Sequence, residues 1–200
     1  MFDTLNQSLF ALINAPATTG PQAVSIAEFI AKDLLYLMAL IMLLGWVRGQ
    51  DTTRRALFNA GLAALLGLAA NQIIHALYVH PRPFAAGFGN QFLEHVADTS
   101  FPSDHGTIMF SVALALLLSR GGAKIGAGVM VMALATAWAR VFLGVHWPLD
   151  MAGAFVVSLL AALLITRVFQ RLSGAAFTAA LALYRWLLAG LHLPNGLFPR

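Results

Sequence analysis

The sequence predicts an all-α membrane protein, a polytopic helical bundle with five or six transmembrane helices in one domain over residues 1–200. Three observations support this fold class. Apolar residues make up 60% of the chain and charged residues only 10%, against about 45–50% and about 25% in soluble globular domains. Residues 56–81 contain no Asp, Glu, Lys or Arg, and this uncharged segment is long enough for a complete helical crossing of the membrane. Basic residues lie between the apolar runs, so the net charge of +4 indicates membrane topology and not nucleic-acid binding.

The first part of the chain predicts an interfacial helix followed by two spans. Residues 1–16 mix apolar side chains with acidic and amide ones, a pattern typical of an amphipathic helix lying at a membrane interface. Apolar runs then predict spans near residues 24–47 and 54–79. Cysteine is absent from the sequence, so there is neither a disulfide framework nor a thiolate site.

The second half of the sequence predicts three further spans and a last helix that either lies at the interface or spans the membrane. The spans are expected near residues 104–120, 123–143 and 148–169. They reach spanning length if the flanking polar residues are interfacial. Residues 174–193 are apolar but carry Arg185 near the centre, and a centred arginine costs about 2.5–3.5 kcal/mol on insertion scales. We therefore expect an interfacial helix there, with a sixth span as the alternative.

The connections between the spans predict the orientation. Three of them carry the basic residues Arg48, Arg54, Arg55, Arg120, Lys124, Arg167 and Arg171. With five spans all three lie on one face, and the positive-inside rule makes that face cytoplasmic. The loops near residues 80–104 and 143–148 then face the periplasm or exterior of a bacterial inner membrane. These two loops hold most of the unusual polar residues.

Two of the polar segments are stiffened by proline. In His80-Pro81-Arg82-Pro83-Phe84 the prolines end the second span and fix the backbone around Arg82. In Phe101-Pro102-Ser103-Asp104-His105, Ser103 and Asp104 are favourable N-cap residues for the helix that follows. A helix N-terminus presents free amide donors and the positive end of a dipole, which suits a phosphate group.

A third segment pairs a histidine with a carboxylate. His146 follows Arg140 by six residues and precedes Asp150 by four, with Pro148 suited to the first turn of the fifth span. At this spacing the carboxylate can orient the imidazole through its second ring nitrogen, a recurring device for a catalytic base or nucleophile. The spacing predicts a polar catalytic site at one membrane face.

Together these segments resemble the signature of the type 2 phosphatidic acid phosphatase superfamily of membrane lipid phosphatases. The family pattern is a Lys seven residues before Arg-Pro, then Pro-Ser-Gly-His, then Ser-Arg, five residues, His, three residues and Asp. This sequence matches at Arg82-Pro83, at Pro102-Ser103 with His105, and at Arg140, His146 and Asp150. The Phe-Pro-Ser-Asp-His form, with His95 and Asp98 upstream, looks like the bacitracin-resistance undecaprenyl-diphosphatase branch.

The sequence departs from the family pattern at three positions. His75 stands where the family has Lys, Asp104 where it has Gly, and Ala139 where it has Ser. We include His75 and Asp104 among the candidate phosphate-binding residues. The alternative for His75 is a helical polar residue bonded to a neighbouring helix. For Asp104 we also expect that its carboxylate keeps His105 protonated, because a nearby carboxylate raises an imidazole pKa.

The resemblance implies a two-step phosphoryl transfer that uses neither metal nor cofactor. His146 would attack the terminal phosphorus, with Asp150 holding its other ring nitrogen, and His105 would act as acid and then base. Arg82 and Arg140 would bind the phosphoryl oxygens. Ser103, with backbone amides of residues 103–105, would complete the oxyanion cradle.

The resemblance also implies a substrate class, with alternatives left open. The expected reaction removes the terminal phosphate of undecaprenyl diphosphate or another polyprenyl diphosphate, and so recycles the carrier lipid for cell-wall synthesis. A broader lipid phosphatase acting on phosphatidate or phosphatidylglycerol phosphate, or a lipid phosphotransferase, would use the same site. A small-solute transporter is the non-enzyme alternative. A divalent metal site at Glu94, His95, Asp98 and His105 matches no known ligand spacing.

Overall fold

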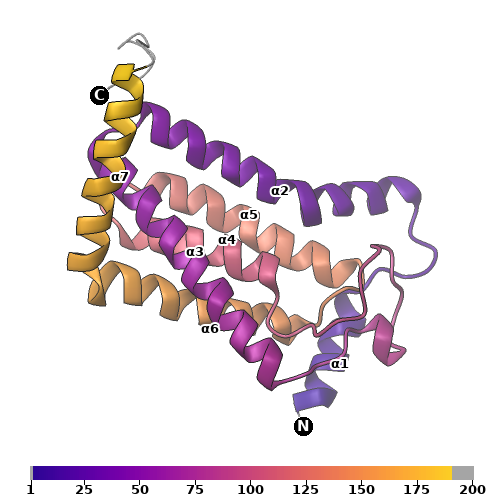
Figure 1. Ribbon diagram of the computed structural model, residues 1–200. Helices are drawn as coiled ribbons and strands as arrows, with labels where there is room; N and C mark the ends of the chain where they lie inside the picture. The colour runs from indigo at the N-terminus through magenta and orange to yellow at the C-terminus, as the bar shows by residue number, and fades with distance from the viewer. Residues whose placement is uncertain (1, 191–200) are drawn as a thin grey trace.

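The computed structural model describes residues 2–190, which are helical apart from their connections (Figure 1). Chain order is α1 (Phe2–Ile13), α2 (Pro21–Arg48), α3 (Asp51–Leu77), the short 3-10 helix η1 (Phe84–Ala86), α4 (Asp104–Leu118), α5 (Ala123–Phe142), α6 (Pro148–Leu163), the π-helical turn η2 (Leu164–Val168) and α7 (Gln170–Gly190). The predicted all-α class is confirmed.

Within the described residues, five helical segments are long and apolar enough to cross a membrane: α2, α3, α5, α6 together with η2, and α7. The helix expected near residues 104–120 is α4, which has only 15 residues. At 1.5 Å per residue it is about 22 Å long, shorter than the hydrocarbon core of about 30 Å. Figure 1 places α4 in the middle of the bundle, where α3, α5 and α6 surround it.

Small residues allow the helices to approach α4 closely. A Cβ atom at Gly67 of α3 would lie 2.8 Å from Thr107 Cγ2, and one at Gly126 of α5 would lie 2.8 Å from the backbone nitrogen of Leu117. Both distances are too short for a real contact, so these helix pairs require glycine. Close approach through small residues is typical of helix packing in membranes.

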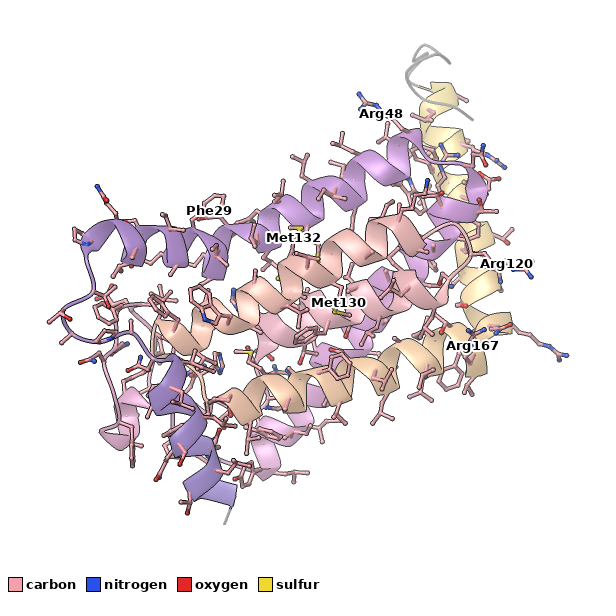
Figure 2. All side chains as sticks on the ribbon, turned by 180° about the vertical axis from the view of Figure 1, so that it is seen from behind. Phe29, Arg48, Arg120, Met130, Met132 and Arg167 are labelled. Atoms are coloured by element: carbon pink, nitrogen blue, oxygen red, sulfur yellow. The ribbon has the colours of Figure 1, made fainter. Side chains whose placement is uncertain are left out.

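The outer surface of the bundle is apolar. α2 buries only Ala27, Ala31 and Met38, while large apolar side chains such as Ile26 and Tyr36 are more than half exposed. Figure 2 shows such side chains projecting outward along the length of the bundle. An apolar surface of this extent requires lipid as its solvent.

The last helix lies across the bundle and not along it. Figures 1 and 2 both show α7 running over the ends of α2 and α3. Phe177 forms ring contacts with Trp46 and Phe58. Further along the helix Tyr184 contacts Trp46, and Arg185 donates to Asp51 at 2.8 Å. All these partners lie in or beside the α2–α3 turn, so α7 covers one end of the bundle.

A π-helical turn sets the direction of α7. The backbone N–H of Phe169 donates to Leu164 O at 2.8 Å, a five-residue step that inserts one residue into the helical repeat. α7 begins at Gln170, after a bend at Phe169, four residues earlier than the sequence predicts. The interfacial placement expected for residues 174–193 stays a prediction, and residues 191–193 lie outside the described part of the chain.

The opposite end of the bundle is closed by α1 and by the loops of residues 78–103 and 143–147. Phe10 of α1 is buried against Trp147 with ring centroids 5.1 Å apart. Asn6 accepts a hydrogen bond from the backbone of Leu149 at 3.1 Å. α1 is therefore fastened to the loop that carries His146, with its other face, including Leu12, exposed.

Candidate active site

The three polar segments singled out in the sequence meet at the end of the bundle that α1 closes. Arg82 follows α3, His105 lies in the first turn of α4, and Arg140 lies in the last turn of α5. His146 occupies the α5–α6 loop, and Asp150 lies in the first turn of α6. Antiparallel packing of α3 to α6 brings these helix ends together, although the residues are up to 68 positions apart in sequence.

His146 lies between two guanidinium groups and one carboxylate. Its Nε2 is 3.1 Å from Arg82 Nη1 and 3.4 Å from Arg140 Nη2, and its Nδ1 is 3.2 Å from Asp150 Oδ2. A guanidinium can only donate hydrogen bonds, so Nε2 must be the acceptor and Nδ1 must carry the proton. The geometry therefore fixes the tautomer whose Nε2 lone pair points toward the two arginines.

Asp150 is fully buried and is held on both sides. Its Oδ2 accepts a hydrogen bond from the backbone N–H of Trp147 at 2.8 Å in addition to contacting His146. Its Oδ1 forms no hydrogen bond but lies 3.4 Å from His80 Nδ1, and that nitrogen is 2.9 Å from Ser100 Oγ. A second histidine thus lies beside the carboxylate that orients the first.

The two arginines are buried and positioned by oxygen acceptors. Arg82 donates through Nε to Asp98 Oδ1 at 2.7 Å and through Nη1 to Val145 O at 2.8 Å. Arg140 donates through Nη1 to Ala31 O at 3.4 Å, while its buried Nε has no hydrogen-bond partner. An unsatisfied buried donor is costly, and a phosphate oxygen would satisfy it.

A cavity of about 460 Å³ gives access to this cluster. His105 and Arg140 line it on one side, His95 lies in the loop above, and Lys32 and Tyr36 of α2 form the opposite wall. Because Tyr36 is largely exposed on the apolar surface of α2, the cavity opens beside the lipid-facing side of the bundle. His146, which is only 2% exposed, lies deeper.

The remaining predicted residues contact protein groups around the start of α4. Ser103 is its N-cap, and its Oγ accepts from the backbone of Gly106 at 3.3 Å. Asp104 Oδ1 accepts from Asn71 Nδ2 at 2.8 Å, and His75 Nε2 lies 3.0 Å from Pro102 O. The contacts of Asp104 and His75 join α3 to the α4 segment, and direct phosphate binding by these residues stays a prediction.

The pKa values of the titratable residues in the loops of the site are shifted by different causes. Burial, assisted by the charges of Arg140 and Arg82, lowers the pKa of His146 far below its usual value and outweighs the raising effect of Asp150. Partial burial also lowers the pKa of His95. Partial burial alone would raise the pKa of Asp98, but its hydrogen bond to Arg82 outweighs this, so that pKa is lowered. His146 is therefore neutral and Asp98 ionised near pH 7.

Sequence reasoning missed several residues of this site. The sequence places Asp98 and His95 only in the branch resemblance and in a metal-site alternative without a matching ligand spacing, and it does not single out Lys32 or Asn71. The ion pair of Arg82 with Asp98 spans 16 positions of irregular loop, where no periodicity signals a contact. Across the described part of the chain, no three His, Asp or Glu side chains form a group that could hold a metal ion.

Residues 56–174 match the family model described as PAP2 superfamily. The putative undecaprenyl-diphosphatase YbjG of Escherichia coli (strain K12) is 38% identical over 187 residues, covering 92% of this chain and 93% of that protein. The undecaprenyl-diphosphatase BcrC of Bacillus subtilis (strain 168) is 32% identical over 163 residues, covering 82% of this chain and 83% of that protein.

Two solved structures share the fold. LpxE of Aquifex aeolicus has a TM-score of 0.65 at 23% identity and covers 80% of this chain and 94% of its own. The first transmembrane PAP2 type phosphatidylglycerolphosphate phosphatase of Bacillus subtilis has a TM-score of 0.58 at 20% identity and covers 85% and 87%.

Fold, site and similarities together define a multi-pass membrane enzyme of the lipid phosphatase class. The chain belongs to the PAP2 superfamily, the type 2 phosphatidic acid phosphatases. The predicted resemblance to this superfamily and to its bacitracin-resistance branch is confirmed, as is the expectation of an enzyme.

Proposed function

We propose that this chain hydrolyses the terminal phosphate of undecaprenyl diphosphate or a closely similar polyprenyl diphosphate. The observation that carries the mechanism is His146, which is neutral, oriented by Asp150, and directs Nε2 toward Arg82 and Arg140. The substrate rests on the relatives YbjG and BcrC, both named as undecaprenyl-diphosphatases. The cavity that opens beside exposed apolar side chains suits a substrate with a long hydrocarbon tail.

In the first step the Nε2 lone pair of His146 attacks the terminal phosphorus and forms a P–N bond. The bond from that phosphorus to the bridging oxygen breaks, and His105 donates a proton to the departing lipid phosphate. Arg82 and Arg140 bind the equatorial oxygens, whose charge is spread in the transition state. The buried guanidiniums need little reorganisation as the charge develops.

In the second step water replaces the protein as the phosphoryl acceptor. His105, now neutral, takes a proton from the attacking water, the P–N bond breaks, and inorganic phosphate leaves. Asp150 keeps the Nδ1 proton of His146 in place during both steps, so that the same ring nitrogen is free for the next cycle. The products are inorganic phosphate and the lipid monophosphate.

The activity test uses purified protein, a panel of lipid phosphates and excess chelator. We expect phosphate release from undecaprenyl diphosphate, none from a His146→Gln variant, and normal release from Arg171→Gln, an exposed position in α7 at the other end of the bundle. A terminally labelled substrate should leave acid-labile, alkali-stable label on the wild-type protein only. Loss of activity in chelator would contradict the metal-free mechanism.

A broader lipid phosphatase remains the second candidate, favoured by the structural likeness to a phosphatidylglycerolphosphate phosphatase. Faster turnover of phosphatidylglycerol phosphate or phosphatidate than of undecaprenyl diphosphate in the same panel would favour it. Transfer of label to a second lipid and not to water would identify a phosphotransferase.

We further propose that the site faces the periplasm or exterior of a bacterial cytoplasmic membrane. Support comes from Arg48, Arg120 and Arg167, which lie at the α7 end in Figure 2, because basic residues concentrate on the cytoplasmic side. The chain contains no native cysteine, so a single exposed one reports the topology. An impermeant maleimide should label Val96→Cys in intact cells and Lys124→Cys only after permeabilisation; the reverse pattern would invert the orientation.

A further inference from the structure

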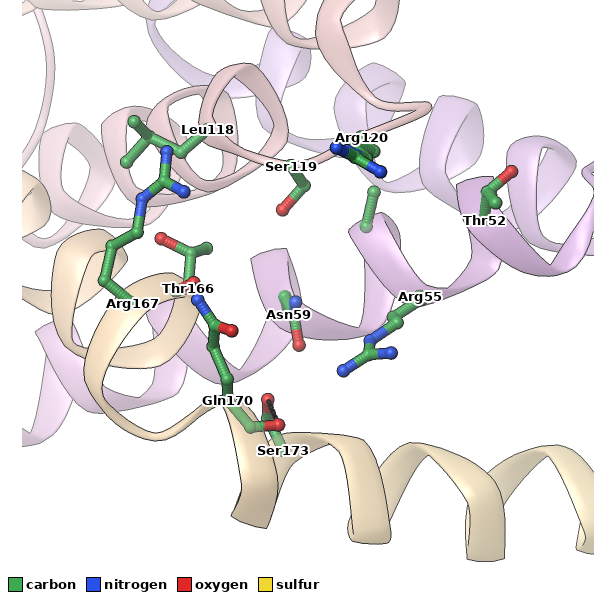
Figure 3. A pocket seen from close by; sticks show the side chains of 11 residues that line it. Thr52, Arg55, Asn59, Leu118, Ser119, Arg120, Thr166, Arg167, Gln170 and Ser173 are labelled. Atoms are coloured by element: carbon green, nitrogen blue, oxygen red, sulfur yellow. Dashed lines mark hydrogen bonds between the residues drawn. The ribbon is translucent and has the colours of Figure 1, made fainter.

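A second basic cavity lies at the α7 end of the bundle, opposite the active site. Its volume is about 370 Å³. The first turns of α3, the α4–α5 connection, the π turn and the start of α7 form its walls. Figure 3 shows the side chains of Arg55, Arg120 and Arg167 around this space, with Asn59 between them.

The three arginines of this cavity carry uncompensated charge. Within residues 2–190, none of the side chains of Arg55, Arg120 and Arg167 forms a hydrogen bond or ion pair, and no acidic residue lines the cavity. The nearby Asp51 is already engaged by Arg54 at 3.2 Å and by Arg185 at 2.8 Å. Three guanidiniums around one space repel each other, and an anion between them would remove that repulsion.

Buried polar atoms in the same walls also lack partners. Asn59, which is 8% exposed, has its Oδ1 buried without a hydrogen bond, and so does the Oγ of Ser119. A buried acceptor without a donor costs free energy. The arginines supply donors for an anion, whereas Asn59 Oδ1 needs a ligand that can itself donate a hydrogen bond.

We propose that this cavity binds the headgroup of an anionic phospholipid in the leaflet at the α7 end, with a hydroxylated headgroup such as glycerol. Its phosphate accepts hydrogen bonds from the guanidiniums, as basic pockets between membrane helices commonly bind lipid phosphates. A headgroup hydroxyl donates to Asn59 Oδ1. Exposed Val168 and Leu172, on either side of the π-turn junction, provide apolar surface for the acyl chains.

A site for a lipid headgroup differs from a site for soluble phosphate in its contacts with the acyl chains. Inorganic phosphate offers the same oxygens to the arginines but has no tail to contact Val168 or Leu172. The site is also separate from catalysis, because its residues lie at the opposite end of the bundle from His146 (Figure 1). Its test therefore reads binding and not phosphate release, so that failure of the proposed function leaves it intact.

The test measures bound lipid by native mass spectrometry and the lipid-induced rise of the melting temperature in detergent. The cavity variant combines Arg55→Gln, Arg120→Gln and Arg167→Gln. The control combines Arg48→Gln, Lys124→Gln and Arg171→Gln, substitutions of exposed residues outside the cavity that remove the same charge. We expect phosphatidylglycerol affinity to fall at least tenfold in the cavity variant and less than twofold in the control. Equal losses would overturn the proposal.

Two further arms address the ligand. Asn59→Leu should weaken phosphatidylglycerol binding several-fold and leave the binding of phosphatidylmethanol, a phosphodiester of the same charge without headgroup hydroxyls, unchanged; an equal loss for both lipids would overturn the role of the hydroxyl. Inorganic phosphate should compete with phosphatidylglycerol only at concentrations at least a hundredfold higher. Competition at matched concentration would overturn the lipid assignment.

Discussion

The two ends of the bundle both gather arginines, but they hold them differently. At the active site Arg82 and Arg140 are 5% and 2% exposed and donate to Asp98, to backbone carbonyls and to His146. At the α7 end Arg55, Arg120 and Arg167 are exposed and form no polar contact within the described residues. Fixed guanidiniums stabilise a developing charge without reorganisation, whereas free ones adapt to a headgroup. In our proposals the same residue type thus serves catalysis at one end and adaptable binding at the other.

The largest expected effect tests the fixed orientation at the active site. Asp150→Asn keeps the shape but removes the carboxylate that holds the Nδ1 proton of His146. We expect kcat to fall by about 10³–10⁴, as for other triads in which the tautomer is lost. The melting temperature checks the fold, because Asp150 also caps the Trp147 backbone. A loss below tenfold would show that the carboxylate does not orient the nucleophile.

A second comparison exchanges arginine for lysine at each end. Arg140→Lys should lower kcat/KM by about 10²–10³, since lysine cannot reproduce the forked donors. Arg120→Lys, with the same loss of geometry at the α7 end, should leave kcat/KM within twofold. Phosphate release from one lipid substrate measures both. Equal losses at the two positions would remove the distinction between fixed and free arginines.

A smaller effect is expected from Asp98, which positions Arg82 from an exposed loop. Asp98→Asn should raise KM about tenfold with little change in kcat, because the guanidinium loses its orienting charge but keeps its carbonyl acceptors. Partial burial is outweighed by the hydrogen bond to Arg82, which lowers the pKa of Asp98 below its usual value of 3.8, so the ion pair is lost only as pH falls below 3.8. A kcat effect larger than the KM effect would contradict a positioning role.

The smallest effect is a pH shift at His146. Since burial lowers its pKa, the folded protein keeps this ring neutral below pH 6.5, the usual value for a histidine. The unfolded chain binds a proton there, so the free energy of unfolding should decrease as pH falls below about 6.5. Nitrogen-15 spectra of histidine-labelled protein, assigned with His146→Gln, should show a neutral ring at pH 5. Titration near 6.5 would contradict the burial argument.

Sequence reasoning identified the candidate residues that the structure brings together, but not the residues that support them. His105, Arg140, His146 and Asp150 follow fixed spacings at helix ends, and antiparallel helix packing brings such ends together. Asp98 and His80 lie in irregular backbone, where the contact depends on how the loop folds over Arg82 and Asp150. Neither hydrophobic periodicity nor capping patterns describe such a loop.

The last helix shows a second limit of sequence reasoning. The sequence presents Arg185 as a cost to membrane insertion, which favours an interfacial helix over a sixth span but does not indicate what the helix packs against. In the structure Arg185 pairs with Asp51, and Phe177 packs on Trp46, because α7 crosses the α2–α3 turn. Pairings between residues more than 100 positions apart leave no signal in a single sequence.

The π turn at Leu164–Val168 makes the length of this segment critical. Such a turn is an α-helix carrying one additional residue, and each residue rotates the following helix by about 100°. Deleting a single residue here would restore an ordinary helix. It would also rotate α7 about its axis, so that Phe177 and Arg185 would point away from their present partners. Insertions and deletions are therefore expected to be excluded from these five positions.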